Sequence, residues 1–134
     1  MKTILFACIH NAGRSQMAAA WFNHLAPKEQ GSAISAGTRP GPRVHPEVHA
    51  AMLEVGIDLS GVTPELLTPE LAAKASLLVT MGCGEECPVV PGLGREDWPF
   101  NDPKGRPIEE VRLIRDGIRA RVEELLARLH TIPG

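Results

Sequence analysis

A cysteine followed by five residues and an arginine links an apolar run to an alanine-rich segment near the start of the chain. The apolar run covers residues 3–7, the cysteine is Cys8 and the arginine is Arg14. Because the run lacks polar alternation, it predicts a strand buried on both faces, as in a parallel sheet covered by helices. Residues 15–25 hold large apolar side chains at helical spacing and predict a helix. The pattern therefore predicts a strand, a tight loop and a helix, with Cys8 at the carboxyl end of the strand.

Further short apolar strands alternate with helices along the rest of the chain. Strands are predicted over residues 33–36, over residues 77–81 and just before Trp98. Alternating strands and helices indicate an α/β fold. We expect a four-stranded parallel sheet flanked by helices on both faces.

Threonine–proline pairs and apolar periodicity mark the helices that follow. Residues 46–55 predict a helix, with a proline in its first turn and a glycine just after its end. Thr63 and Thr68, each followed by proline, predict two more helix starts with threonine as the cap. The last helix is expected over residues 107–129, where apolar residues recur every three or four positions.

Composition and charge exclude several classes of function. Of the 134 residues, 43% are hydrophobic and 22% charged, and the formal net charge is −2. This balance provides no basic surface for nucleic acid and no polybasic patch for a membrane. The arginines of the last helix are expected to pair with acids four residues later, as Arg112 with Asp116. We expect one domain over residues 1–134 and a monomer.

The cysteines need an explanation other than a disulfide framework. The apolar run at the start is too short to cross a membrane and ends without a cleavage-like sequence, so we expect a cytoplasmic protein. Thiols stay reduced in that compartment. The three cysteines, Cys8, Cys83 and Cys87, are also an odd number. Without a disulfide framework, the remaining roles for these cysteines are core packing, metal binding and catalytic chemistry.

Residues 8–15 read CIHNAGRS and have the features of an oxyanion site. Such a loop curls so that successive N–H groups point at one centre, and the following helix adds its positive end. Arg14 brings a planar fork that suits a tetrahedral oxyanion. Beneath the anion, Cys8 is favoured as the nucleophilic thiolate by the N–H groups, by Arg14 and by the Ser15 hydroxyl. We predict Cys8 and Arg14 as catalytic residues, and as substrate-binding residues Ile9, His10, Asn11, Ala12, Gly13, Arg14 and Ser15.

The loop resembles the phosphate-binding loop of the low-molecular-weight protein tyrosine phosphatases and of the arsenate reductases related to them. The similarity covers essentially the whole chain and includes RSQMA at 14–18, SAGT at 35–38 and DWPFNDP at 97–103. It implies that Asp102, the aspartate before the last of these prolines, is the general acid. It also implies that Asn11 supports the loop, a position that in related reductases sometimes lies near a bound potassium ion.

A second cysteine segment favours reduction of arsenate over hydrolysis of phosphate esters. Residues 81–88 read MGCGEECP and resemble the cysteine segment of the reductases. The resemblance implies that Cys83 attacks the arsenic adduct of Cys8, leaving a disulfide, and that Cys87 then attacks Cys83. Gly82 is one of two glycines that flank Cys83 and permit the movement. The chain also has no tyrosine with which to grip a phosphotyrosine ring.

The resemblance implies an external thiol as the reductant and no bound cofactor. Members that depend on thioredoxin usually have a longer spacer between the last two cysteines. The short spacer here is similar to members that use a small thiol such as mycothiol, with a mycoredoxin-type protein. We expect arsenate as substrate, phosphate or sulfate as competing oxyanions, and either of these two reductant systems.

Three other interpretations stay open. The chain is alternatively a phosphatase for small phosphomonoesters or phosphoproteins, or a non-enzymatic sensor of thiol redox state or arsenic. A zinc site of Cys8, His10, Cys83 and Cys87 has a poor ligand spacing, and Arg14 opposes a cation there, so we predict no metal. The remaining histidines carry no motif and are expected at the surface: His24, His45, His49 and His130.

Overall fold

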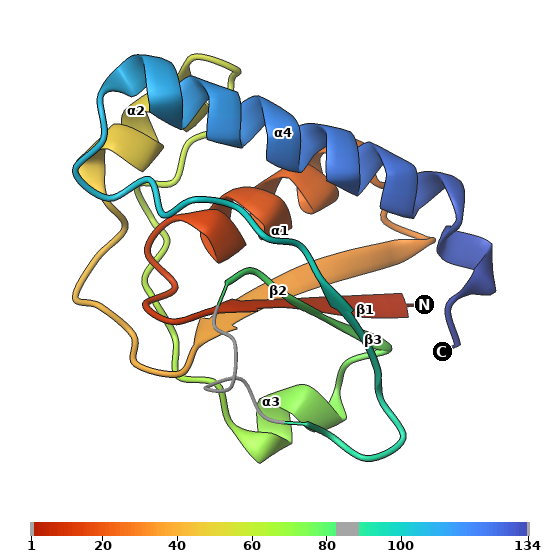
Figure 1. The fold of residues 1–134 in the computed structure, drawn as a ribbon. Coiled ribbons are helices and arrows are strands. Elements are labelled where there is room, and N and C mark those ends of the chain that lie inside the picture. Colours follow the sequence, from red (N-terminus) through yellow and green to blue (C-terminus); the bar gives the residue numbers. More distant parts are fainter. Residues whose placement is uncertain (1, 83–88, 134) are drawn as a thin grey trace.

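A parallel sheet forms the centre of the molecule in the computed structural model, which describes residues 2–82 and 89–133 (Figure 1). Its strands lie in the order β2-β1-β3-β4, and every neighbouring pair is parallel. The predicted four-stranded parallel sheet is therefore confirmed. The strands are β1 (Lys2–Cys8), β2 (Gly31–Gly37), β3 (Leu77–Thr80) and β4 (Gly94–Asp97).

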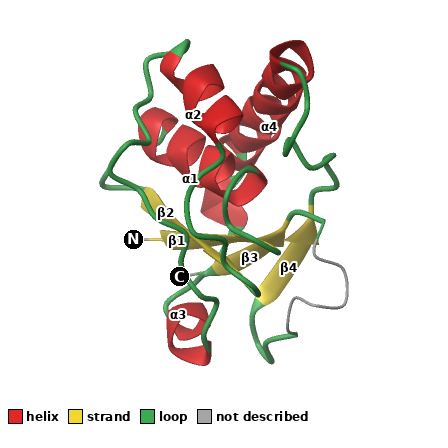
Figure 2. Cartoon of the chain, turned by 90° about the vertical axis from the view of Figure 1, so that its left-hand side faces the viewer, coloured by secondary structure: helices red, strands yellow, loops and turns green. Residues whose placement is uncertain are grey.

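Helices cover both faces of this sheet, as the sequence predicts (Figure 2). The longer helices lie on one face, and the short α3 (Pro69–Ala73) lies on the other. Within residues 2–82 and 89–133, no helix combines the length and the apolar character that crossing a membrane requires. The helices are α1 (Arg14–Leu25), α2 (Pro46–Leu53), α3 (Pro69–Ala73) and α4 (Ile108–Ala127), and a 3-10 turn (Leu129–Thr131) follows α4.

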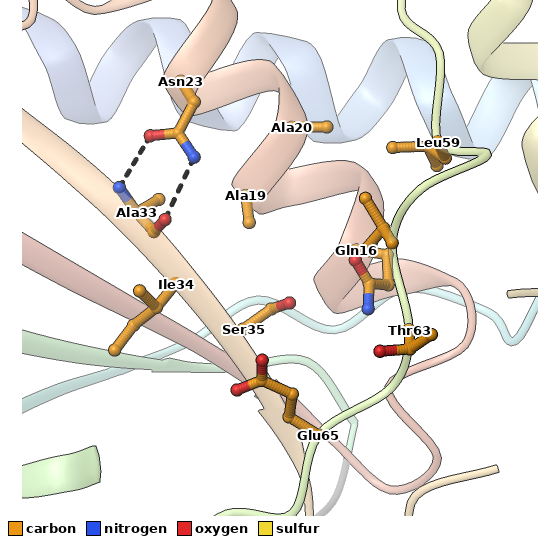
Figure 3. Close-up of a pocket in the computed structure, with 11 residues that line it drawn as sticks. Gln16, Ala19, Ala20, Asn23, Ala33, Ile34, Ser35, Leu59, Thr63 and Glu65 are labelled. Carbon is orange, nitrogen blue, oxygen red and sulfur yellow. Dashed lines mark hydrogen bonds between the residues drawn. The ribbon is translucent and has the colours of Figure 1, made fainter. Parts of the chain in front are cut away.

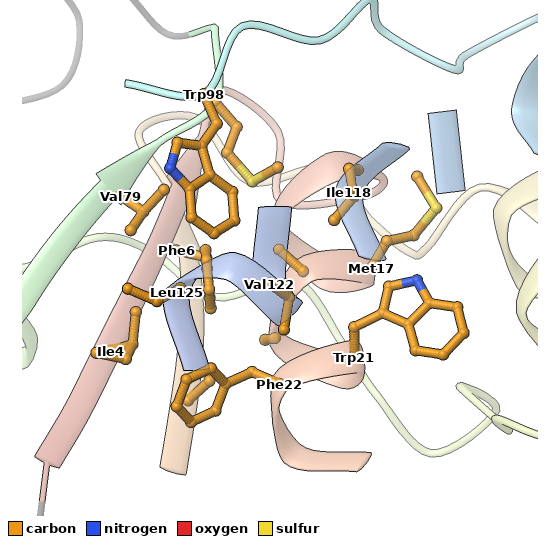
Figure 4. Close-up of a cluster of buried hydrophobic side chains, with 14 of the residues drawn as sticks. Ile4, Phe6, Met17, Trp21, Phe22, Val79, Trp98, Ile118, Val122 and Leu125 are labelled. Atoms are coloured by element: carbon orange, nitrogen blue, oxygen red, sulfur yellow. The ribbon is translucent and has the colours of Figure 1, made fainter. Parts of the chain in front are cut away.

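Strand β1 divides its side chains between two cores because successive residues of a strand point to opposite faces. Ile4, Phe6 and Cys8 belong to the larger core, while Leu5 and Ala7 belong to the smaller one beneath α3. In the larger core, side chains of β1 and β3 meet those of α1 and α4 (Figure 4). The continuous apolar run is thus explained by burial on both faces, and Cys8 ends it just inside the protein.

The helix predicted at Thr63 is wrong, whereas Thr68 does cap α3. The backbone around Thr63 is extended because it bonds to the carboxyl end of β2 and to the loop after β1. The Gly37 N–H donates to the Glu65 carbonyl at 2.8 Å, and the Glu65 N–H donates to Asn11 Oδ1 at 2.9 Å. These long-range bonds satisfy the backbone groups that a helix would otherwise pair locally.

Helices α2 and α4 are joined by charged side chains at their outer faces. Arg112 donates to both carboxylate oxygens of Glu54, at 2.6 to 3.1 Å, and the Arg115 Nη1 donates to Glu54 at 2.8 Å. The pairing of Arg112 with Asp116 expected from the spacing is therefore wrong, and Asp116 instead accepts from Arg115. A two-bond fork to a carboxylate on another helix is stronger than a single contact along one helix.

Candidate active site

The loop after β1 turns its carbonyl groups outward. The carbonyls of Ile9, His10 and Ala12 accept from backbone N–H groups of residues 39, 41 and 45, at 2.8 to 2.9 Å. Among the described residues, none accepts a hydrogen bond from the N–H groups of residues 9–13. Helix α1 begins directly after the loop, so the N–H groups of its first turn also lack helical acceptors. The loop thus presents a run of free donors, the arrangement that binds an anion.

Asn11 braces the loop from inside. Its φ is 51° and its side chain is fully buried. The Nδ2 group donates to Ser15 Oγ at 2.7 Å, while Oδ1 accepts from Gln16 Nε2 at 3.1 Å and from the Glu65 N–H at 2.9 Å. Asparagine tolerates a positive φ better than most residues, and these three bonds hold it there.

Gly37 allows the loop to curl against the end of β2. A Cβ at this position would lie 2.5 Å from the Ile9 carbonyl oxygen and 2.9 Å from the Asn11 nitrogen. Any side chain would therefore push the loop away from the strand. This close approach gives a physical reason for the glycine in the SAGT segment.

The Cys8 thiol lies at the base of the loop and contacts one hydroxyl. Its Sγ is 2.8 Å from Ser15 Oγ, and the residue is 2% exposed. Because Ser15 Oγ already accepts from Asn11, its own proton is free to point at the sulfur. A donor aimed at sulfur stabilises the thiolate form.

The Arg14 guanidinium closes another side of the site. It is 9% exposed, and its Nη1 donates to the Phe100 carbonyl at 3.0 Å. A Cβ on Gly82 would lie 2.3 Å from the same Nη1, and Gly82 has a φ of 90°. The sequence suggests Gly82 as a source of movement, but in the structure it makes room for Arg14. The arginine therefore lies between the ends of β1 and β3 and the segment after β4.

Asp102 lies in the turn that packs on the loop. The adjacent Pro103 touches Gly13, where a Cβ would be 2.8 Å from the proline Cγ. The Asp102 carboxylate accepts from the Lys104 N–H at 3.0 Å, and Arg106 Nε donates to the Asp102 carbonyl at 2.7 Å. The fold thus brings Cys8, Arg14 and the turn around Asp102 to one edge of the sheet, and the catalytic roles of these residues stay predictions.

The other two predicted catalytic residues, Cys83 and Cys87, lie outside the described residues. Their roles stay predictions, as does the zinc alternative that includes them. No group of three potential metal ligands occurs within residues 2–82 and 89–133.

A small pocket lies behind the loop, between α1 and β2 (Figure 3). Its volume is about 230 Å³. Gln16 and Glu65 line it and also bond to Asn11, one through its side chain and the other through its backbone. At the other end of the pocket, the Asn23 side chain makes two hydrogen bonds to the Ala33 backbone, at 2.8 and 3.0 Å. Sequence reasoning missed the support from Gln16 and Glu65, although Gln16 belongs to the RSQMA segment.

The chain is similar to known proteins over nearly its whole length. The family described as low molecular weight phosphotyrosine protein phosphatase matches residues 3–132. The chain belongs to this family. Arsenate reductase 2 of Staphylococcus epidermidis is 35% identical over 130 residues, which cover 95% of this chain and 98% of the relative.

Solved structures of arsenate reductases have the same fold as this member of the phosphatase family. One, described as an arsenate reductase in the phosphate binding state, has a TM-score of 0.82 and 34% identity and covers 96% of this chain and 99% of that chain. A thioredoxin-dependent arsenate reductase of Corynebacterium glutamicum has a TM-score of 0.81 and 33% identity. The match covers 98% of this chain but only 62% of the Corynebacterium chain. The predicted resemblance to the phosphatases and arsenate reductases is confirmed.

Proposed function

We propose that this chain reduces arsenate to arsenite, with Cys8 as the nucleophile. The observation that carries the proposal is the loop itself, in which Cys8 lies below a run of free N–H donors and beside the Ser15 hydroxyl. The relatives that match almost the whole chain, at 35% identity, are arsenate reductases. The geometry of the loop and the identity of these relatives together favour attack of the Cys8 thiolate on arsenate.

The first step joins sulfur to arsenic. Arsenate binds as an oxyanion to the N–H groups of the loop and to Arg14. The Cys8 thiolate forms the S–As bond while one As–O bond breaks, and Asp102 gives its proton to the departing oxygen, which leaves as water. Pro103 packs against the loop, which supports this role for the neighbouring Asp102.

The second step transfers two electrons to arsenic. A second thiolate, from Cys83 or from a small external thiol, attacks the Cys8 sulfur and forms an S–S bond. The electron pair of the S–As bond stays on arsenic, which leaves as arsenite. In the internal route Cys87 then attacks Cys83, which frees Cys8 and leaves a Cys83–Cys87 disulfide for an external reductant.

The same loop supports a second candidate function, hydrolysis of small phosphate esters. The family is described as a phosphotyrosine protein phosphatase, and one solved relative is described in a phosphate binding state. In that reaction water, rather than a thiol, attacks the Cys8 adduct. Residual phosphatase activity is expected even of a reductase because the loop is shared.

Arsenite release from the purified protein tests both functions and the reductant. Arsenate is supplied with thioredoxin, thioredoxin reductase and NADPH, and in a parallel assay with mycothiol and its redoxin. Several turnovers with thioredoxin, abolished by Cys83→Ser, would support the internal relay. Turnover with the small thiol alone would assign the second attack to an external sulfur.

The remaining outcomes oppose the proposal. Hydrolysis of aryl phosphates without arsenite in either assay would favour the phosphatase. Binding of arsenic without turnover of either substrate would favour a sensor. Cys8→Ser is the control, since it must abolish every reaction that passes through the Cys8 adduct.

A further inference from the structure

His45 is partly buried and lies beside the anion loop, a position that the sequence gives no reason to expect. Its backbone N–H donates to the Ala12 carbonyl at 2.9 Å. A Cβ on Gly13 would be 3.6 Å from His45 Cδ2 and 2.8 Å from Pro103 Cγ. The imidazole and the proline after Asp102 therefore meet at the same point of the loop.

Helix α2 begins just after His45. Its first turn also makes a hydrogen bond to the turn around Asp102. Glu47 Oε1 accepts from the Gly105 N–H at 3.3 Å. The Asp102 carboxylate accepts from the Lys104 N–H at 3.0 Å within the same turn. One element thus contacts both the anion loop and the segment that carries the proposed acid.

Four charged or titratable groups face the His45 imidazole. Burial lowers its pKa most strongly, and Lys104 and His10 lower it further. Glu47 and Asp102 act in the opposite direction and raise it, but the pKa stays below the ordinary value of 6.5. The ring is therefore mostly neutral at pH 7. It makes no hydrogen bond to the described residues, so both of its nitrogens are available to water or to a bound anion.

We propose that His45 is a positioning residue for Asp102: its imidazole supports the turn around Asp102 against the loop. This proposal rests on the proposed role of Asp102 as the general acid. A turn held against the loop keeps the Asp102 carboxyl group where the departing oxygen needs its proton.

If the imidazole lies close to the Asp102 carboxyl group, the charges of the two groups are coupled, and this coupling is measurable without any turnover. The His45 imidazole is titrated by NMR in the wild-type protein and in Asp102→Asn, and its signal is assigned by its loss in His45→Asn. Since Asp102 raises the pKa of His45, removal of the carboxylate should shift the titration to lower pH. A midpoint that is the same in both proteins would overturn the proposal, whether or not the chain reduces arsenate.

A double-mutant cycle on single-turnover arsenite formation tests the positioning role. His45→Asn keeps a good residue for the start of α2 and the backbone bond to Ala12. It should slow the reaction about tenfold. This is a fraction of the roughly 10²- to 10⁴-fold acceleration that a positioned general acid provides. In the Asp102→Asn background the same change should have little further effect, because the residue acts through Asp102.

Two further variants separate positioning from general damage. His45→Gln should recover part of the rate, because its longer amide side chain fills more of the space beside the turn than asparagine does. His49→Asn, one turn later on α2, should leave the rate unchanged. Losses that multiply in the double variant would mean that His45 and Asp102 act independently and would overturn the proposal. If the wild-type protein forms no arsenite, the proposed function fails, and the NMR titration alone decides the coupling.

Discussion

Ser15 is the residue of the loop that contacts Cys8, the proposed nucleophile. It accepts from Asn11 and lies 2.8 Å from the Cys8 sulfur, so its hydroxyl proton is available to that sulfur. A hydrogen bond to a charged group contributes about 1.5–3 kcal/mol. We expect Ser15→Ala to slow single-turnover arsenite formation about 10- to 100-fold. Ser32→Ala, on β2, is the control, and an equal effect of both variants would contradict the assignment.

Gly82 has a role that depends on its lack of a side chain. Its φ is 90°, and a Cβ would lie 2.3 Å from the Arg14 Nη1. We expect Gly82→Ala to displace the guanidinium and to weaken phosphate binding by about tenfold or more, the value of one charge-assisted hydrogen bond. The positive φ should also cost about 1–2 kcal/mol of stability.

Gly92 offers a matched control for the loss of stability that a side chain causes at a positive φ. Its φ is 81°, but a Cβ there would meet nothing within 4 Å. Gly92→Ala should lose a similar amount of stability in urea unfolding and retain the affinity for phosphate in calorimetry. If both variants bind phosphate as the wild type does, the contact with Arg14 has no part in binding.

How far the site follows from the sequence differs between residues. Cys8 and Arg14 are predictable because a fixed spacing between a strand and a helix leaves few geometries for the loop. The support by Gln16 and the position of His45 are not predictable, since each depends on a contact with a segment distant in sequence. His45 reaches the loop only because the connection after β2 bonds to the outward carbonyls.

Elements with a strong local signal are predicted better than those set by distant partners. Apolar runs identify β1, β2 and β3, since a strand in a covered parallel sheet needs no partner information to be recognised. Strand β4 reads GRED and has no such run, so the sequence places it only as a short strand before Trp98. The Thr63-Pro64 pair has the signature of a helix start, yet bonds to Gly37 and Asn11 extend the chain there. Arg112 likewise has a suitable acid on its own helix but bonds to Glu54 on α2.

The contact between α2 and α4 leads to a prediction on pH and stability. Hydrogen bonds from Arg112 first, and then from Arg115, lower the pKa of Glu54 from 4.5 to about 2. A lowered carboxyl pKa contributes stability that is present above the unfolded value, near 4.5, and is lost as the pH falls towards about 2. Glu54→Gln should therefore unfold at a lower temperature than the wild type at pH 6, with the two curves converging below about pH 3.

Salt provides the control for this effect, because the pair lies at the surface, where solvent screens charges. Sodium chloride at about 1 M should reduce the difference between Glu54→Gln and the wild type at pH 6. A difference that stays the same from pH 6 to pH 2.5 would show that the substitution acts through packing and not through charge.

The molecule as a whole gathers its chemistry at one edge of the sheet. The carboxyl ends of β1 and β3 lead to Cys8 and Gly82, and the segment after β4 leads to Asp102. Because parallel strands end at the same edge, segments far apart in sequence meet there. In the proposed function the N–H groups and Arg14 form a site for an anion before any substrate binds, so occupation of the site should stabilise the whole fold.

This linkage gives a measurement that is independent of catalysis. A ligand that binds only the folded state, at about 100 times its dissociation constant, adds about 2.7 kcal/mol, or roughly 10 °C in Tm for a domain of this size. We expect phosphate and arsenate to raise the Tm by this amount at saturation, and chloride at equal ionic strength to have little effect. Arg14→Lys should lose most of the shift because an ammonium cannot reproduce the two-bond fork, whereas Asp102→Asn should keep it. A shift that survives Arg14→Lys in full would place the stabilising anion elsewhere on the molecule and remove the physical basis for oxyanion binding at the loop.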